Sequence, residues 1–510
     1  MIAALGSATL LGVEGRPVTV EVHVANGLPA FAIVGLPDAA CREARDRVRA
    51  AFLSSGLAWP MRRVTVNLAP SSMRKAGAGL DLAIAVGLLV ATGEIDGPAT
   101  RDCAFLGELG LDGSLRPVPG VLALVDAAQA PAVVCPAASL AEARLVPGRR
   151  VFGARSLLEV LDGLTGRGAW PAPAPREPTG ATGASPAAPA PDLAGVRGQR
   201  VAKRALEVAA TGAHHVLFVG PPGAGKTMLA RCLPGLLPPL GGEDALEVAR
   251  VRSAAGLPLP PPGELGRPPF RAPHHSCSPV ALVGGGTTQL RPGELSLASG
   301  GVLFLDELGE FPASVLETLR QPLEDGAVLV SRARASTRLP ARVLLVAAAN
   351  PCPCGEGTEP GACRCTPAMR ERYARRLSAP FLDRFDLLVR VDRPSPADLL
   401  SSGDAEATAA VAARVARARA RAAERGVRAN AQLSDARLDE VAVLSDDARG
   451  LLEARLAGGA LSARGLARIR RVARTLADLA GAGDVLDAEH VAVALELRSA
   501  RDVLLGTRRA

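Results

Sequence analysis

The first third of the chain alternates short strand-like and helical runs of hydrophobic residues. In a half-buried strand apolar and polar residues alternate, whereas a helix repeats its apolar residues every three to four positions. These patterns predict strands at Val18–Val24 and Val64–Leu68 and helices at Ala39–Ser54 and Gly77–Val90. A hairpin is expected within Phe105–Val118, with its turn at Asp112-Gly113. We therefore expect a first domain of mixed strands and helices over residues 1–166.

The hydrophobic pattern stops over residues 167–192, where Pro, Ala, Gly, Ser and Thr dominate. Seven prolines lie within these 26 residues. A segment of this composition cannot bury a core, and dense proline favours extended backbone. The sequence therefore predicts a linker at 167–192.

Beyond the linker, buried strands and helices follow one another in the order of an α/β domain. Apolar runs of strand length stand at Val216–Val219, Gly301–Leu305 and Ala341–Ala349, and helical patterns at Val201–Ala210 and Met228–Leu233. Two later helices, Asp404–Arg425 and Leu466–Leu479, are rich in Ala or Leu and in Arg. We expect an α/β core over residues 193–395 and a helical lid over residues 396–510.

A glycine-rich turn joins the predicted strand Val216–Val219 to the helix after it. Its sequence is Gly220-Pro221-Pro222-Gly223-Ala224-Gly225-Lys226-Thr227, which fits G-x-x-x-x-G-K-[ST]. Backbone N–H groups and the helix dipole favour a polyphosphate in such a turn. Lys226 would reach the β- and γ-phosphates of ATP, and the Thr227 hydroxyl would ligate Mg²⁺. The sequence therefore predicts an ATP site.

Polar side chains end the next two buried strands. Asp306 and Glu307 follow Gly301–Leu305, and Asn350 follows Ala341–Ala349. At strand ends beside the phosphate loop, Asp306 would hold Mg²⁺ and Glu307 would polarise the attacking water. Asn350 would face the γ-phosphate and help to orient that water.

The charge balance adds little to this picture. The chain has 59 Lys and Arg against 51 Asp and Glu, a net charge of +8, which permits a polyanionic partner without establishing one. No apolar run reaches the roughly 18–20 residues of a membrane span, and the N-terminus lacks the basic segment of a signal peptide. We expect a cytoplasmic protein without a membrane partner.

Four of the nine cysteines are crowded between residues 352 and 365. They are Cys352, Cys354, Cys363 and Cys365, in the pattern C-x-C-x₈-C-x-C. Four thiolates this close suit a structural Zn²⁺ site. The C-x-C spacing is tighter than the usual one, so free thiols or a redox site are the alternative.

Two other polar segments are less specific. His274 and His275 are neighbours and would point apart on any regular element, so we predict no catalytic metal there. Arg332 and Arg334 lie at the tip of a predicted basic hairpin, Ser331–Ser336. That tip is either a solvated loop or a contact to DNA.

The segment Lys75–Asp81 and the hairpin after it resemble the proteolytic domain of Lon-type proteases, which implies a Lon-protease-like α+β fold for residues 1–166. Those enzymes have a serine nucleophile where this chain has Gly79. Their lysine follows the hairpin, where this chain reads Pro119–Leu124 with no lysine. A Ser–Lys pair needs both members, so we expect a structural or partner-binding domain and no protease.

The core resembles the magnesium-chelatase-like branch of the AAA+ ATPases, and the whole chain resembles the ComM/YifB family. The motifs that carry this likeness are the phosphate loop, Arg271–Ser276, Pro292–Ala298 and Ala349–Gly355. The resemblance implies that Asn350 is the sensor 1 residue and Arg384 an arginine finger for a neighbouring subunit. It also implies that Arg464 is the sensor 2 residue on the helical lid.

The resemblance further implies a homo-hexameric motor on single-stranded or branched DNA, of helicase or branch-migration type. Two rivals stay open from the residues: an AAA+ ATPase that remodels or regulates proteins, and a chelatase-type subunit that inserts Mg²⁺ into a porphyrin. Pore chemistry for DNA and for polypeptide can look alike, so the sequence does not choose between the DNA motor and the protein-remodelling ATPase.

Overall fold

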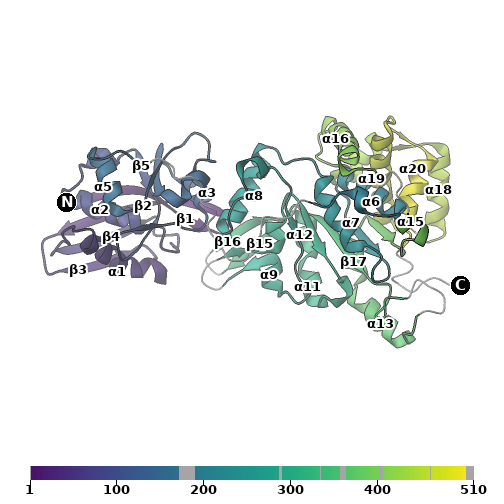
Figure 1. The fold of residues 1–510 in the computed structure, drawn as a ribbon, viewed down its shortest axis with the longest axis horizontal. Helices are drawn as coiled ribbons and strands as arrows, with labels where there is room; N and C mark the ends of the chain where they lie inside the picture. The colour runs from purple at the N-terminus through teal and green to yellow at the C-terminus, as the bar shows by residue number, and fades with distance from the viewer. Residues whose placement is uncertain are drawn as a thin grey trace.

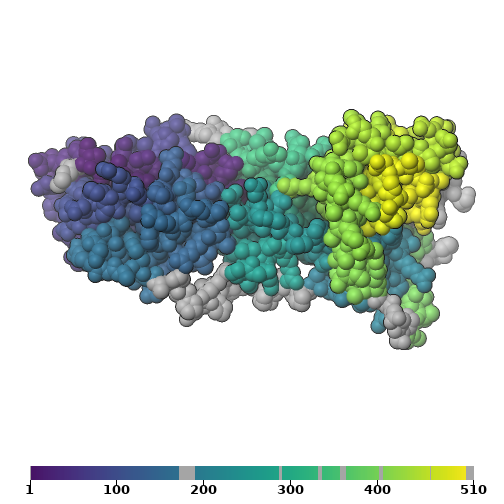
Figure 2. Space-filling view, turned by 90° about the horizontal axis from the view of Figure 1, so that it is seen from above, coloured from purple at the N-terminus to yellow at the C-terminus, as the bar shows by residue number. Residues whose placement is uncertain are grey.

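A computed structural model shows an elongated molecule with three regions in line (Figure 1). The N-terminal sheet lies at one end, the phosphate-loop sheet in the middle and the C-terminal helices at the other end. The space-filling view shows the purple N-terminal residues and the yellow C-terminal residues at opposite ends (Figure 2). The described residues are 2–171, 190–286, 290–332, 335–356, 363–400, 406–459 and 461–500. Most of the predicted linker, residues 172–189, therefore lies outside them.

The N-terminal region is built on a seven-stranded mixed sheet of order β3-β4-β2-β1-β5-β8-β9. Its strands are β1 (Ile2–Leu11), β2 (Glu14–Ala25), β3 (Ala30–Val34), β4 (Arg63–Ala69), β5 (Cys103–Phe105), β8 (Ala132–Pro136) and β9 (Arg150–Ala154). The sequence pattern did not predict β1, because its apolar and small polar residues do not alternate cleanly. The predicted hairpin forms β6 (Glu108–Leu109) and β7 (Leu115–Arg116).

Helices pack on this sheet: α1 (Ala39–Ser54), α2 (Asp81–Thr92), α3 (Val121–Ala127), α4 (Leu140–Ala143) and α5 (Leu157–Thr165). Asp38 caps α1 by accepting a hydrogen bond from the Cys41 N–H at 2.8 Å. Helix α2 begins at Asp81 rather than at Gly77 and is buried over most of its length, in keeping with its apolar sequence. Asp81 is buried and is paired with Arg47 at 2.6 Å, so its charge is compensated.

The middle region is a five-stranded parallel sheet of order β11-β14-β17-β10-β18. The strands are β10 (Val216–Val219), β11 (Phe270–Arg271), β14 (Val302–Leu305), β17 (Leu344–Ala349) and β18 (Leu387–Arg390). Every residue of β10, β14 and β17 is buried, as expected for a sheet covered on both faces. Since the strands are parallel, their carboxyl ends meet at one edge, where ligands bind in such sheets.

Helices around this sheet include α6 (Arg200–Gly212), α7 (Lys226–Cys232), α8 (Gly242–Ala254), α9 (Pro279–Val283), α10 (Glu294–Leu297), α11 (Ala313–Thr318), α12 (Arg320–Asp325), α13 (Pro367–Arg376), α14 (Ala379–Leu382) and α15 (Pro396–Leu400). Two ribbons stand apart from the sheet: β12 (Gly284–Gly285) with β13 (Arg291–Pro292), and β15 (Ala327–Arg332) with β16 (Ala335–Pro340). The second ribbon is the predicted basic hairpin.

The C-terminal region is helical. It contains α16 (Thr408–Glu424), α17 (Asp435–Val441), α18 (Asp446–Ala457), α19 (Ala463–Ala480) and α20 (Ala488–Glu496), with the short parallel pair β19 (Val443–Leu444) and β20 (Val485–Leu486). Buried residues of α16 and α19 share one hydrophobic cluster with α6 and the sheet. The α/β class with a helical C-terminal region is thus confirmed. In the described part of the chain no helix is long and apolar enough to cross a membrane.

Candidate nucleotide-binding site

The predicted phosphate loop connects β10 to α7. Gly223 has φ of +77° and Gly225 has φ of +88°, a left-handed backbone that glycine adopts without strain. At Gly220 a Cβ would lie 1.9 Å from the Val391 carbonyl oxygen of the neighbouring chain segment, so only glycine fits. Helix α7 then begins at Lys226, with its N-terminus toward the loop.

Lys226 is buried over the loop. Its Nζ donates to the carbonyl oxygens of Gly220 at 2.7 Å and Pro221 at 2.9 Å, and to Asn350 Oδ1 at 3.2 Å. Burial lowers the pKa of Lys226, whereas the charges of Asp306 and Glu307 oppose that shift. The ammonium group is therefore held at the point where the phosphate loop and the strand end of Asn350 meet.

Thr227 and Asp306 are brought together although 79 positions separate them. The Thr227 hydroxyl donates to Asp306 Oδ2 at 2.8 Å, and the other carboxylate oxygen accepts from the Glu307 N–H at 2.9 Å. A hydroxyl and a carboxylate are hard oxygen ligands, and few of them per site is the rule for Mg²⁺ bound with a nucleotide. This pair fits the predicted magnesium position.

Glu307 begins a short turn with φ of +51°, unusual for a residue with a side chain. Its carboxylate oxygen Oε2 lies 3.3 Å from His275 Nδ1, and its side chain is 59% exposed. The His275 ring lies beside the His274 ring, with centroids 4.0 Å apart, and meets Phe311 edge-on. No role was predicted for His275, although the motif Arg271–Ser276 was a signal that could have found it. The two neighbouring rings do not point apart here, because they lie outside the regular helices and strands.

Asn350 follows β17, which pairs with both β10 and β14 and so stands between the phosphate loop and the two carboxylates. Its side chain contacts Lys226, as described above, and its backbone carbonyl accepts from the Tyr373 hydroxyl at 3.0 Å. Tyr373 is buried on α13 and was not singled out by the sequence. It fixes the strand end that carries Asn350.

Arg384 and Arg464 lie close to each other. Both line one cavity of about 280 Å³, together with the basic Arg320 and Arg468 and the acidic Glu324 and Asp383. Arg384 is paired with Glu324 of its own chain, a contact that the sequence did not predict. Arg464 is exposed near the start of α19, whose N-cap is Ser462. The finger and sensor 2 candidates therefore share one surface.

The four clustered cysteines converge although residues 357–362 between them lie outside the described chain. Their sulfur atoms all lie within 4.8 Å of one another, with Cys352 3.3 Å from Cys354 and 3.6 Å from Cys363. Backbone hydrogen bonds from Glu356 and Arg364 lower the pKa of Cys354 to about 6. The group also abuts the phosphate loop, since a Cβ at Gly355 would lie 2.5 Å from Pro222 Cδ.

Two further predicted features are the basic hairpin tip and the segment that follows the N-terminal hairpin. The backbone places Arg332 at the end of β15, whereas Arg334 lies outside the described residues. In the N-terminal region the chain after the hairpin, Pro119–Leu124, turns at Gly120 into α3. Lys75 is fully buried and donates to the Gly35 carbonyl at 3.1 Å and to the Pro70 carbonyl, so its amine is committed to backbone groups.

Models of one family match three stretches of the chain. Residues 192–399 match "Magnesium chelatase, subunit ChlI", residues 20–139 match "Subunit ChlI of Mg-chelatase", and residues 405–498 match "Magnesium chelatase, subunit ChlI C-terminal". The competence protein ComM of Haemophilus influenzae is 42% identical over 501 residues, 98% of this chain and 97% of that protein. The chain belongs to the ComM/YifB family.

Another member of this family and one more distant protein are also similar to the chain. The uncharacterized protein YifB of Escherichia coli is 40% identical over 500 residues, 97% of this chain and 96% of YifB. The Holliday junction branch migration complex subunit RuvB of Methanoregula boonei is 29% identical over 215 residues, 40% of this chain and 47% of RuvB. The family has a magnesium-chelatase-like AAA+ core, which indicates an ATPase.

Proposed function

We propose that the chain hydrolyses ATP at the carboxyl edge of the five-stranded sheet. The observation that carries this proposal is the meeting there of Lys226 and Thr227 with Asp306 and Asn350, from three separate segments. Lys226 would bind the β- and γ-phosphates, and Thr227 with Asp306 would hold Mg²⁺, which offsets the phosphate charge. Glu307 would accept the proton of the attacking water and Asn350 would orient that water.

The ATPase would work as a cytoplasmic homo-hexameric motor on DNA, of helicase or branch-migration type. Its four-part organisation would be a Lon-protease-like domain without peptidase activity at 1–166, a linker at 167–192, the AAA+ core at 193–395 and the lid at 396–510. What supports a DNA substrate is the net charge of +8, the basic hairpin, and the names of the relatives ComM and RuvB. A polymer that threads a ring would meet the Arg332 and Arg334 side of the hairpin.

The choice of polymer can be tested by ATP turnover. We expect forked and single-stranded DNA to raise the rate, with little sequence preference and a steep decline as salt is added, because phosphate contacts release counterions. Unfolded casein at equal mass is the control. Stimulation by casein and none by DNA would instead assign the chain to the protein-remodelling ATPases. Mg²⁺ insertion into a porphyrin is disfavoured because it needs partner subunits that this chain does not contain.

We also propose that Cys352, Cys354, Cys363 and Cys365 hold a structural Zn²⁺. A tetrahedron with Zn–S bonds of about 2.3 Å has edges of about 3.8 Å. The sulfur separations of 3.3, 3.6 and 3.7 Å are close to that value. Zinc would brace the segment between Asn350 and α13.

Metal analysis checks the zinc proposal. Protein purified without chelator should contain about one zinc per chain, given the affinity of such sites. Cys363→Ser should lose that zinc, whereas Cys277→Ser, which changes a cysteine outside the cluster, should keep it. A metal-free wild-type protein in which all four thiols react freely in the native state would retire the proposal in favour of free or redox-active thiols.

A further inference from the structure

The turn between β1 and β2 lies against the base of the β15–β16 hairpin. A Cβ at Gly12 would lie 2.9 Å from Thr337 Cγ2 and 3.2 Å from Leu339 Cδ2. Val13, next in the turn, is 8% exposed and packs in the same hydrophobic cluster as Leu339 and Val328. The tip of the N-terminal sheet thus supplies part of the apolar floor on which the hairpin rests.

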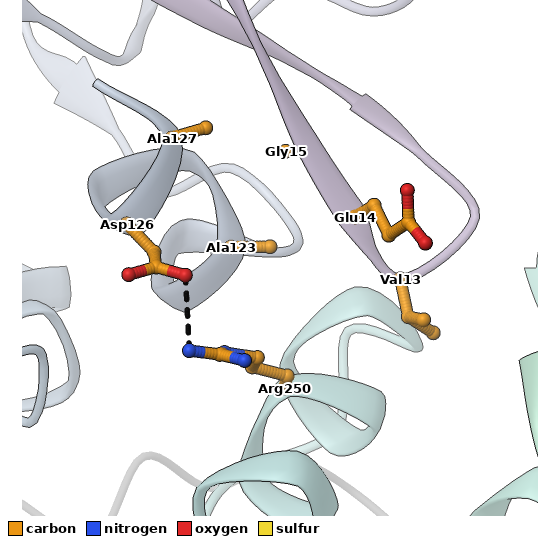
Figure 3. A pocket seen from close by; sticks show the side chains of 7 residues that line it. All are labelled: Val13, Glu14, Gly15, Ala123, Asp126, Ala127 and Arg250. Atoms are coloured by element: carbon orange, nitrogen blue, oxygen red, sulfur yellow. Dashed lines mark hydrogen bonds and ion pairs between the residues drawn. The ribbon is translucent and has the colours of Figure 1, made fainter. Parts of the chain in front are cut away.

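A second contact joins α3 of the N-terminal region to α8 of the core (Figure 3). The Gly120 N–H donates to the Ser253 carbonyl at 2.8 Å, and Arg250 pairs with Asp126 at 2.9 Å. Ala249 on α8, and Leu259 after it, are buried in the cluster that the N-terminal residues around α3 form. A cavity of about 200 Å³ between α3, the β1–β2 turn and α8 separates the two contacts.

Both contacts come from one closely packed part of the N-terminal region. A Cβ at Gly15 would lie 2.0 Å from the Ala123 carbonyl oxygen, so β2 and α3 touch backbone to backbone. On the core side both contacts lead to the same hairpin. Helix α8 is tied to Arg342, the second residue after the hairpin. Arg342 forms ion pairs with Asp244 at 3.0 Å and with Glu247 at 2.7 Å, both on α8.

The hairpin depends on such outside support. It is a two-stranded sheet separate from the five-stranded one, and an isolated two-stranded ribbon is at best marginally stable in water. Its apolar residues Val328 and Leu339 are nevertheless buried. The chain runs from its end at Pro340 through β17 to Asn350 at the nucleotide site. A shift of the hairpin would therefore reach Asn350 through the three connecting residues 341–343 and the buried strand β17.

We propose that residues 2–166 act as an internal brace. They dock on the core through the Gly12–Val13 turn and α3, and they hold the β15–β16 hairpin in a fixed position relative to the nucleotide site. The α3 segment stands where the Lon-type resemblance places a lysine. In this chain that segment forms the contact with α8. The bracing itself is independent of the substrate. Its consequence, that ATP turnover responds to a polymer at the hairpin, rests on the proposed DNA function.

The test uses the full chain with Val13→Asp, which places a carboxylate in the apolar contact. Leu28→Asp is the matched control, because Leu28 is 88% exposed in the same region. Amide hydrogen exchange should rise on the order of tenfold or more over residues 327–340 in Val13→Asp and stay at the wild-type value over β10 and β14. ATP turnover without DNA should persist, and stimulation by forked DNA should be lost.

A second variant covers the case in which Val13→Asp does not fold. Asp126→Arg should raise exchange over residues 327–340 by a smaller factor, and adding Arg250→Asp should reverse that rise. Unchanged exchange in both variants would overturn the brace. Faster exchange with full DNA stimulation would contradict the coupling between the braced hairpin and ATP turnover. If DNA does not stimulate the wild type, the proposed motor fails, while the exchange measurement still decides the brace.

Discussion

Glu307→Gln should bind ATP as tightly as the wild type and hydrolyse it slower by a factor on the order of 10²–10⁴, the usual contribution of a positioned general base. The amide keeps the size of the side chain and its place beside His275, but it cannot take a proton from water. Since Glu307 is exposed and makes its polar side-chain contact at the protein surface, the fold should be unaffected. Single-turnover ATP hydrolysis and fluorescent nucleotide binding measure the two effects.

Lys226→Ala is the matched comparison. It removes the ammonium group that contacts the phosphate loop and Asn350, so nucleotide binding itself should be lost. Glu310→Gln, a nearby carboxylate paired with Arg376, serves as the control that should leave turnover intact. A wild-type rate in purified Glu307→Gln would remove the catalytic assignment of that residue and direct attention to another base.

The parts of the fold that the sequence predicted are those written in local patterns. The strands β10, β14 and β17 are continuous apolar runs, and each is followed directly by a residue of the candidate site: Gly220 of the phosphate loop, Asp306 or Asn350. Parallel pairing then brings the three strand ends to one edge, so local pattern and topology together bring the candidate site residues side by side. The apolar start of the chain was harder to interpret, because β1 alternates poorly and is recognised only from its pairing with β2.

The contacts that the sequence could not predict join residues far apart along the chain. His275 meets Glu307, Tyr373 meets the Asn350 carbonyl, and Arg384 meets Glu324, and no spacing rule connects such positions. The docking of the N-terminal region is of the same kind. It depends on the complementary shapes of Gly12 and Thr337, and a glycine in a turn signals a turn without signalling what packs on it.

Arg384→Ala should keep ATP binding and lose turnover by on the order of 10³-fold or more, the effect of an arginine that stabilises the charge of the transferring phosphoryl group. Arg384 lines a cavity with Arg320, Arg464 and Arg468, and in our proposal this basic surface faces the nucleotide of a neighbouring subunit. Arg384→Ala subunits mixed with Lys226→Ala subunits should therefore regain activity. In the mixed ring, a Lys226→Ala subunit supplies its intact arginine to the intact ATP site of an Arg384→Ala neighbour.

The shared cavity extends this test to Arg464. If both arginines act on the same neighbouring nucleotide, Arg464→Ala should also be rescued by Lys226→Ala. Mixing Arg384→Ala with Arg464→Ala should then restore nothing, because every interface lacks one of the two. Rescue in that last mixture would mean that Arg464 serves the ATP of its own subunit. A chain that stays monomeric with an ATP analogue, with no rescue in any mixture, would contradict the oligomeric motor altogether.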